Sequence, residues 1–141
     1  MTIETIPRTI NYYYLNCEFL DDFNPENQDR FCALFDIITT LSKTRAHIRY
    51  QPFGEKYIFI QDVKVASDRK IIQGKLRCIR KDILPELMNL QTDETRGIEA
   101  QEEEGLVETT HFIIDYSNEQ KKLAIEFNMF GARIGDFVKY I

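Results

Sequence analysis

The sequence predicts an α+β fold, with a mainly antiparallel sheet of about five to six strands and two helices packed on one of its faces. Three observations predict it. Several segments alternate apolar and polar residues, two segments repeat apolar residues with helical spacing, and no β-α-β unit recurs along the chain. The expected element order is β-α-β-β-β-loop-β-β-α. The length of 141 residues fits a single domain over residues 1–141.

The first strand is expected over residues 10–19, where aromatic and branched side chains suit a pleated sheet. Strict alternation places Tyr13 and Leu15 on one face and Tyr12 and Tyr14 on the other. One of these pairs should face the core, and the other should form an aromatic edge.

The first helix is expected to begin at Asn24-Pro25-Glu26. Asparagine caps a helix, proline presets the first helical φ angle, and glutamate suits the positive end of the helix dipole. The helix should end near residues 42–44. Its apolar residues recur on one stripe that should be buried, made of Phe31, Leu34, Phe35, Ile38 and Leu41.

Three strands separated by turns are expected to form a meander over residues 45–50, 56–64 and 71–80. Residues 45–50 alternate strictly between basic and less polar side chains, which is typical of a half-buried strand. Gly74 interrupts the third strand and indicates either a bulge or a close approach of neighbouring atoms.

Residues 82–105 are predicted to form a mobile acidic excursion with a short helix around residues 86–90. Connections of this length are uncommon in compact domains unless they are functional or flexible. Two further strands are expected at residues 107–116 and 121–129, and a last helix should follow Gly131.

The composition excludes several classes of protein. Cys17, Cys32 and Cys78 are isolated and odd in number, which argues against a disulfide framework or a zinc site. Residues 1–8 lack the apolar run of a signal peptide, and no apolar segment approaches the length of a membrane span. We therefore expect a cytoplasmic protein with no membrane partner, no metal site and no cofactor.

Charge is divided unevenly along the chain. Residues 43–81 contain 11 Lys or Arg and three Asp or Glu, a net charge of +8, and the rest contains 7 basic and 20 acidic residues, a net charge of −13. The overall net charge of −5 hides this division. A basic stripe on a sheet could follow a phosphate backbone. The candidate nucleic-acid-binding residues are Arg45, His47, Arg49, Lys75, Arg77, Arg80 and Lys81.

A second interpretation of the same charges stays open. A run of charge more often forms an ordinary solvated face, here paired with acids from the excursion at residues 82–105. The opposite charges also suggest that the excursion could lie over the basic stripe as an acidic lid.

Two weak patterns point to catalysis, although no catalytic residue is assigned. Asp62 and Lys64 share one face of a strand, as the acid and lysine of a PD-(D/E)xK nuclease do, and Glu55 is the nearest second acid. His111 shares a face with Asp115 and could serve as a general base. An exposed ion pair and a surface histidine are the commoner roles of such residues.

A familiar sequence pattern, in which two strands lead to a glycine-containing turn and a short helix, is carried by three segments, residues 74–85, 104–115 and 123–141. In this pattern the chain resembles the N-terminal domain of a group of phage-exclusion proteins that includes RexA and, more distantly, the Kiwa defence protein KwaB. The resemblance implies a role in phage defence, sequence-independent binding of DNA, usually as a homodimer, and a further C-terminal domain. It carries over no catalytic residue.

These observations lead to one hypothesis and two alternatives. The first is a non-enzymatic module of an anti-phage defence protein that binds nucleic acid without sequence specificity. The second is a protein-interaction domain that recognises a phage protein or tethers an effector, using the acidic excursion or the edge at Tyr12 and Tyr14. The third is a metal-dependent nuclease that uses Asp62 and Lys64.

Overall fold

The computed structural model describes residues 7–16, 27–82 and 84–141, and it describes residues 27–29 as backbone only. The expected helix start at Asn24-Pro25-Glu26 and the last part of the first predicted strand lie outside the described residues. The elements in chain order are β1 (Ile10–Leu15), α1 (Asn27–Lys43), the 3₁₀ helix η1 (His47–Arg49), β2 (Gln51–Phe53), β3 (Lys56–Ala66), β4 (Ile71–Arg80), β5 (Glu86–Met88), β6 (Thr95–Gly97), β7 (Leu106–Asp115), β8 (Lys121–Glu126) and α2 (Ile134–Tyr140).

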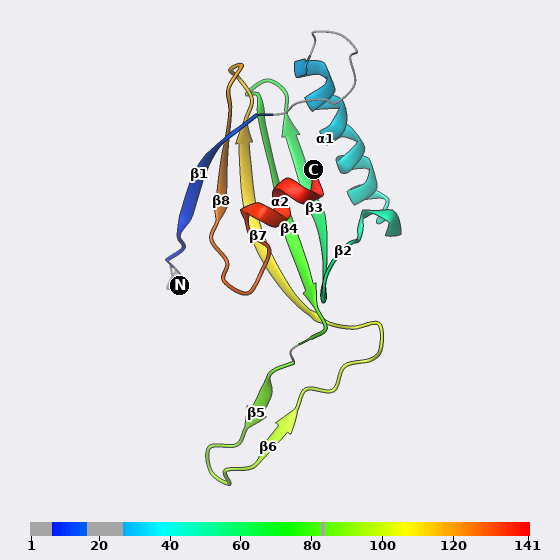
Figure 1. Ribbon diagram of the computed structural model, residues 1–141, viewed down its shortest axis with the longest axis vertical. Coiled ribbons are helices and arrows are strands. Elements are labelled where there is room, and N and C mark those ends of the chain that lie inside the picture. Colours follow the sequence, from blue (N-terminus) through cyan, green and yellow to red (C-terminus); the bar gives the residue numbers. More distant parts are fainter. Residues whose placement is uncertain (1–6, 17–26, 83) are drawn as a thin grey trace, which may run out of the picture.

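Within these residues, six strands form one sheet in the order β1-β8-β7-β4-β3-β2, and β5 and β6 form a separate hairpin (Figure 1). Each pairing in the described part of the chain is antiparallel. The predicted α+β fold is therefore confirmed. A three-stranded meander is present as β2-β3-β4, but its first strand, Gln51–Phe53, does not overlap the strand predicted at residues 45–50.

The core lies between one face of the sheet and the helices α1 and α2. Phe31, Phe35 and Ile38 of α1 are buried in one cluster with Phe137 of α2. The ring of Phe137 packs edge-on against Phe112 of β7, with 5.1 Å between the ring centroids. The predicted stripe of α1 is confirmed, because its buried residues follow the expected spacing. Across the described residues, no helix combines the length and apolar character needed to cross a membrane.

The strand predicted over residues 45–50 is wrong. Arg45 adopts a positive φ of 52° in the turn after α1, and the 3₁₀ helix η1 follows. The expected faces are also reversed, because Ile48 is 72% exposed whereas Arg49 is only 6% exposed. The Arg49 guanidinium packs over the ring of Phe59 of β3, 4.9 Å from its centre, and this contact holds the segment against the sheet without a strand.

The excursion between β4 and β7 is a hairpin, and the helix predicted around residues 86–90 is wrong. β5 and β6 pair through three residues each, and the hairpin extends away from the main sheet (Figure 1). The turn is closed by backbone hydrogen bonds from Asn89 to Glu94 and from Asp93 to Asn89, each with a donor–acceptor distance of 2.9 Å. The Asn89 side chain also accepts from the Gln91 N–H, a local bond that competes with helix formation.

Candidate nucleic-acid interface

The face of the sheet opposite α1 and α2 is not covered by either helix. Its side chains alternate with the core residues along each strand, as the pleat requires. We call this surface the open face, and its residues include Tyr12 and Tyr14 of β1, Lys122, Ala124 and Glu126 of β8, Thr109, His111, Ile113 and Asp115 of β7, Gln73, Lys75 and Arg77 of β4, and Gln61, Asp62 and Lys64 of β3.

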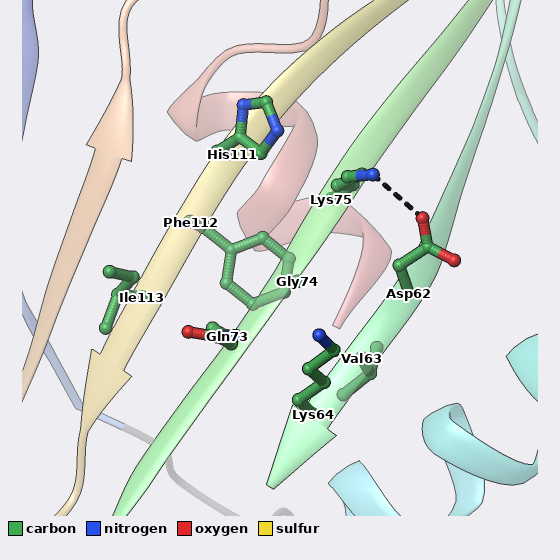
Figure 2. Close-up of a pocket in the computed structure, with 9 residues that line it drawn as sticks. All are labelled: Asp62, Val63, Lys64, Gln73, Gly74, Lys75, His111, Phe112 and Ile113. Carbon is green, nitrogen blue, oxygen red and sulfur yellow. Dashed lines mark hydrogen bonds and ion pairs between the residues drawn. The ribbon is translucent and has the colours of Figure 1, made fainter.

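A shallow hollow of about 510 Å³ lies near the middle of the open face. Figure 2 shows its polar side chains, which come from three neighbouring strands, and the floor beneath them. His111, Lys75 and Asp62 lie in one row across the strands, and Ile113, Gln73 and Lys64 lie in a second row (Figure 2). The hollow therefore presents both cationic and hydrogen-bonding groups above an apolar base.

The floor of the hollow depends on a glycine. A Cβ atom placed on Gly74 would lie only 2.7 Å from Cζ of Phe112 and 3.4 Å from Cγ2 of Val63. The Phe112 ring therefore occupies the space in which a side chain at Gly74 would stand. The close approach predicted from the sequence at this position is confirmed, and a bulge lies directly opposite Gly74 in the neighbouring strand β3.

That bulge interrupts β3 beside the hollow. The pairing of β3 with β4 shifts between Gln61 and Lys64, and Asp62 adopts a positive φ of 54°. The Asp62 N–H donates to Oγ of Ser42 at the end of α1, at 3.1 Å, instead of to a strand. Bulges commonly redirect a side chain in this way, and here the Asp62 carboxylate turns toward β4.

Asp62 forms an ion pair with Lys75, with 2.9 Å between Oδ2 and Nζ. This hydrogen bond from Lys75 lowers the pKa of the Asp62 carboxyl below its usual value. Both side chains remain substantially exposed, so the pair contributes little to stability. Lys75 is consequently held over the hollow rather than extended into solvent.

His111 is held in a similar way by Glu126 of β8. Oε2 of Glu126 lies 2.8 Å from both the backbone N and Nδ1 of His111. Partial burial alone would raise the pKa of Glu126, but the hydrogen bonds from the His111 backbone and ring outweigh it and hold the pKa below its usual value. The other ring nitrogen, Nε2, is the one left for a ligand.

The remaining basic residues of the open face differ in how they are held. Arg77 donates to Oε1 of Gln61 at 3.1 Å, and its Nε is buried without a hydrogen-bond partner among the described residues. Lys64 and Lys122 are exposed and form no ion pair or hydrogen bond with the described part of the chain. Each still acts on a neighbouring carboxylate, because Lys64 adds to the effect of Lys75 in lowering the pKa of Asp62, and Lys122 adds to the effect of Ser117 in lowering the pKa of Asp115.

Exposed tyrosines line the β1 edge of the same face. Tyr12 is 77% exposed and Tyr14 is 62% exposed, whereas Tyr13 between them packs against the core. The alternation predicted for this strand is confirmed. Tyr12 pairs with Ala124, which in turn pairs with Ile113, so a low apolar strip connects the tyrosine edge with the hollow.

The structure does not gather the seven predicted nucleic-acid-binding residues on one surface. Lys75 and Arg77 lie on the open face, but Arg45 and His47 are exposed beyond the end of α1. Arg49 is buried, where it donates to the Ser42 carbonyl at 3.3 Å and lies 4.9 Å from the centre of the Phe59 ring.

Arg80 and Lys81 lie at the end of β4, at the base of the hairpin. Arg80 forms an ion pair with Asp82 at 3.4 Å, and Nζ of Lys81 donates to the carbonyl of Glu102 at 2.7 Å. The single basic stripe expected from the sequence is therefore absent from the described residues, and only its β4 part, Lys75 and Arg77, belongs to the open face.

The residues proposed for catalysis are also separated. Glu55 lies in the turn before β3, seven residues from Asp62 and roughly 23 Å away at about 3.3 Å per residue of extended strand, and it lines a different hollow. Asp115, the acid expected beside His111, accepts instead from Ser117 at 2.6 Å. Among the described residues, no group of three or more His, Cys, Asp or Glu side chains could hold a metal ion.

Sequence reasoning missed Glu126 and Lys122, which complete the open face. The signal was present, because these two residues alternate with the buried Leu123 and Ile125. Neither a curated protein nor a solved structure matches this chain, and no protein-family model matches it. The site is therefore interpreted from its own geometry.

Proposed function

We propose that this chain binds single-stranded nucleic acid, without sequence specificity, through the open face of its sheet. The observation that carries the proposal is the combination of Lys64, Lys122 and Lys75 with the exposed rings of Tyr12 and Tyr14 on one uncovered surface. Lysines attract the phosphate backbone, and aromatic rings stack on bases of any sequence. Each stacked base typically contributes about 1–3 kcal/mol to such complexes.

The shape of the surface favours a single strand over a duplex. Six strands spaced about 4.8 Å apart span roughly 24 Å, which is about twice the width of the major groove of B-DNA. The face therefore cannot enter that groove as a helix or a two-stranded ribbon does. A single strand can instead lie across the sheet with its bases against the tyrosine edge and the apolar strip at Ala124 and Ile113.

The biological setting of the proposal rests on the resemblance to phage-exclusion proteins alone. In that setting, the chain is a non-enzymatic module of an anti-phage defence protein in the cytoplasm. Cys32 and Cys78 are unpaired thiols, which suits a reducing compartment. A plaque assay comparing bacteria with and without the gene tests this setting independently of nucleic-acid binding.

The binding proposal is tested by fluorescence anisotropy with labelled single-stranded and duplex oligonucleotides across a salt series. Three or four cationic contacts predict a slope of log Kd against log salt of about 2 to 3 for a single strand. Lys75→Gln with Arg77→Gln should reduce this slope, and Tyr12→Ala with Tyr14→Ala should weaken binding with the slope unchanged. Arg45→Gln is the matched control, because it removes one charge away from the open face.

Two outcomes would contradict the proposal. One is the absence of binding at low salt. The other is a loss of affinity per removed charge in Arg45→Gln equal to that in the variant that combines Lys75→Gln with Arg77→Gln, which would mean that charge alone, and not the open face, attracts the nucleic acid. The nuclease alternative predicts that the oligonucleotides are cleaved in the presence of a divalent metal ion and that Asp62→Ala abolishes this cleavage. Gel electrophoresis of the same samples measures it.

A further inference from the structure

The hairpin of β5 and β6, which we call the arm and define as residues 84–99, has the features of a docking element. Residues 84–97 are all exposed. Leu87 is 45% exposed, Met88 is 56% exposed, and Leu90 at the tip is 93% exposed. Large apolar side chains rarely stand in water on an element that has no partner.

The arm also lacks the support that a hairpin of this size needs. β5 and β6 pair with no other strand of the described chain. Two-stranded hairpins are at best marginally stable in water, and a third strand or a packing surface is required for independent stability. The closed turn at Asn89 and Asp93 nevertheless gives the arm a defined shape. A second surface that packs against it would supply the missing support.

The base of the arm directs it away from its own sheet (Figure 1). Nζ of Lys81 donates to the carbonyl of Glu102 at 2.7 Å, which ties the two segments together at the stem. A Cβ on Gly105 would lie 2.7 Å from the carbonyl oxygen of Arg80, so the segments are in direct backbone contact there. The arm therefore does not form the lid over its own basic residues that the opposite charges suggested.

Charge indicates which surface the arm fits. The arm, residues 84–99, holds four acidic residues and one basic residue, a net charge of −3. On the open face, Lys64 and Lys122 form no ion pair or hydrogen bond within the described residues, although each acts electrostatically on a neighbouring carboxylate, Lys64 on Asp62 and Lys122 on Asp115. An acidic arm with apolar side chains at Leu87 and Met88 matches a face on which lysines surround the apolar strip of Ala124 and Ile113.

We propose that the arm of one copy of this chain docks on the open face of a second copy, and that the exchange is reciprocal about a two-fold axis. Each copy then satisfies its own unpartnered face with the arm of the other, as closed symmetric dimers do.

Sedimentation velocity of the purified chain, without nucleic acid and over a concentration series at low salt, tests this inference. The intact chain should form a dimer. Replacement of residues 84–99 by a short glycine-serine linker should raise the dimer dissociation constant at least about tenfold. The two-residue variant Glu86→Lys with Glu99→Lys keeps the arm and should weaken the dimer similarly, so a folding defect of the deletion cannot decide the result. Glu119→Lys, in the turn between β7 and β8, is the control for net charge.

The sharpest test restores the interaction by exchanging charges. Adding Lys64→Glu and Lys122→Glu to the arm variant reverses both surfaces, and it should recover dimer affinity to within about threefold of the intact chain. A chain that stays monomeric throughout the series, or a dimer unaffected by loss of the arm, overturns the inference. Because nucleic acid is absent from these samples, that failure would leave the binding proposal standing, and failure of the binding proposal would leave this one standing.

Discussion

Substitution of Gly74 by alanine is the perturbation whose effect follows most directly from the structure. The new Cβ would lie 2.7 Å from Cζ of Phe112 and 3.0 Å from its Cε1, whereas carbon atoms in favourable contact are about 3.5–4.0 Å apart. The ring must therefore move by about 1 Å. It has little room to do so, because Phe112 is 1% exposed and packs against Phe137.

The expected cost is a balance of two terms. Overpacking a filled core typically costs about 1–3 kcal/mol. Replacing glycine with alanine also lowers the conformational entropy of the unfolded chain, which stabilises the folded state by roughly 0.4–1 kcal/mol. We therefore expect Gly74→Ala to lower the free energy of unfolding by about 1–2 kcal/mol. Urea unfolding should show a lower midpoint with an unchanged slope.

A matched control and a double variant make this prediction refutable. Gly97→Ala adds the same methyl group where no atom lies within 4 Å, so its stability should stay within about 0.5 kcal/mol of the parent. Phe112→Leu removes the ring atoms that clash, and the double variant should therefore cost less than the sum of the two single changes. Equal stability of Gly74→Ala and the parent, or strict additivity, would refute the reasoning.

Three further predictions concern the side chains of Arg49, Tyr140 and His111. Arg49→Ala should destabilise the fold by about 2 kcal/mol in urea unfolding, and Arg49→Met by less, because Met keeps the buried stem; loss of nucleic-acid affinity with full stability would contradict the structural role of Arg49. Tyr140→Phe removes a 2.9 Å hydrogen bond to the Arg49 carbonyl, and it should cost about 1 kcal/mol and lower Tm by a few degrees in a calorimetric scan. His111→Ala should raise the carboxyl pKa of Glu126, measured by carbon NMR, because a donor to the carboxylate is lost. A lowered carboxyl pKa stabilises the fold above the usual carboxyl range and ceases to do so as pH falls through the folded value, so the variant should lose stability at neutral pH and not in strong acid.

Local patterns were sufficient to predict most of the fold. The alternation of Tyr12, Tyr13 and Tyr14 assigned the two faces of β1, and the spacing of Phe31, Phe35 and Ile38 assigned the buried side of α1. Both patterns depend on contacts of each residue with a single surface, and such patterns are visible in one sequence.

Features that depend on long-range pairing could not be predicted in the same way. Residues 45–50 alternate in sequence, but the decisive fact is that Arg49 packs beside Phe59, which belongs to a different element. The ion pair of Asp62 with Lys75 requires a bulge, and the contact of His111 with Glu126 requires one particular register of β7 against β8. A shift of one residue in either pairing would reverse the faces, so periodicity alone does not determine these contacts.

The pairing of β1 with β8 has a consequence for synthesis of the protein. Ile10 pairs with Glu126, so β1 leaves the ribosome long before its partner strand β8 has been made. Until then, the alternating tyrosines of β1 and the outer edge of β7 have no strand beside them. Such non-local pairing delays folding, because the entropy of closing a long loop is lost before the contacts of the paired strands can stabilise the fold. A nascent chain stalled before Lys121 would therefore expose two unpaired strands, and chaperone binding should concentrate on this stage of translation.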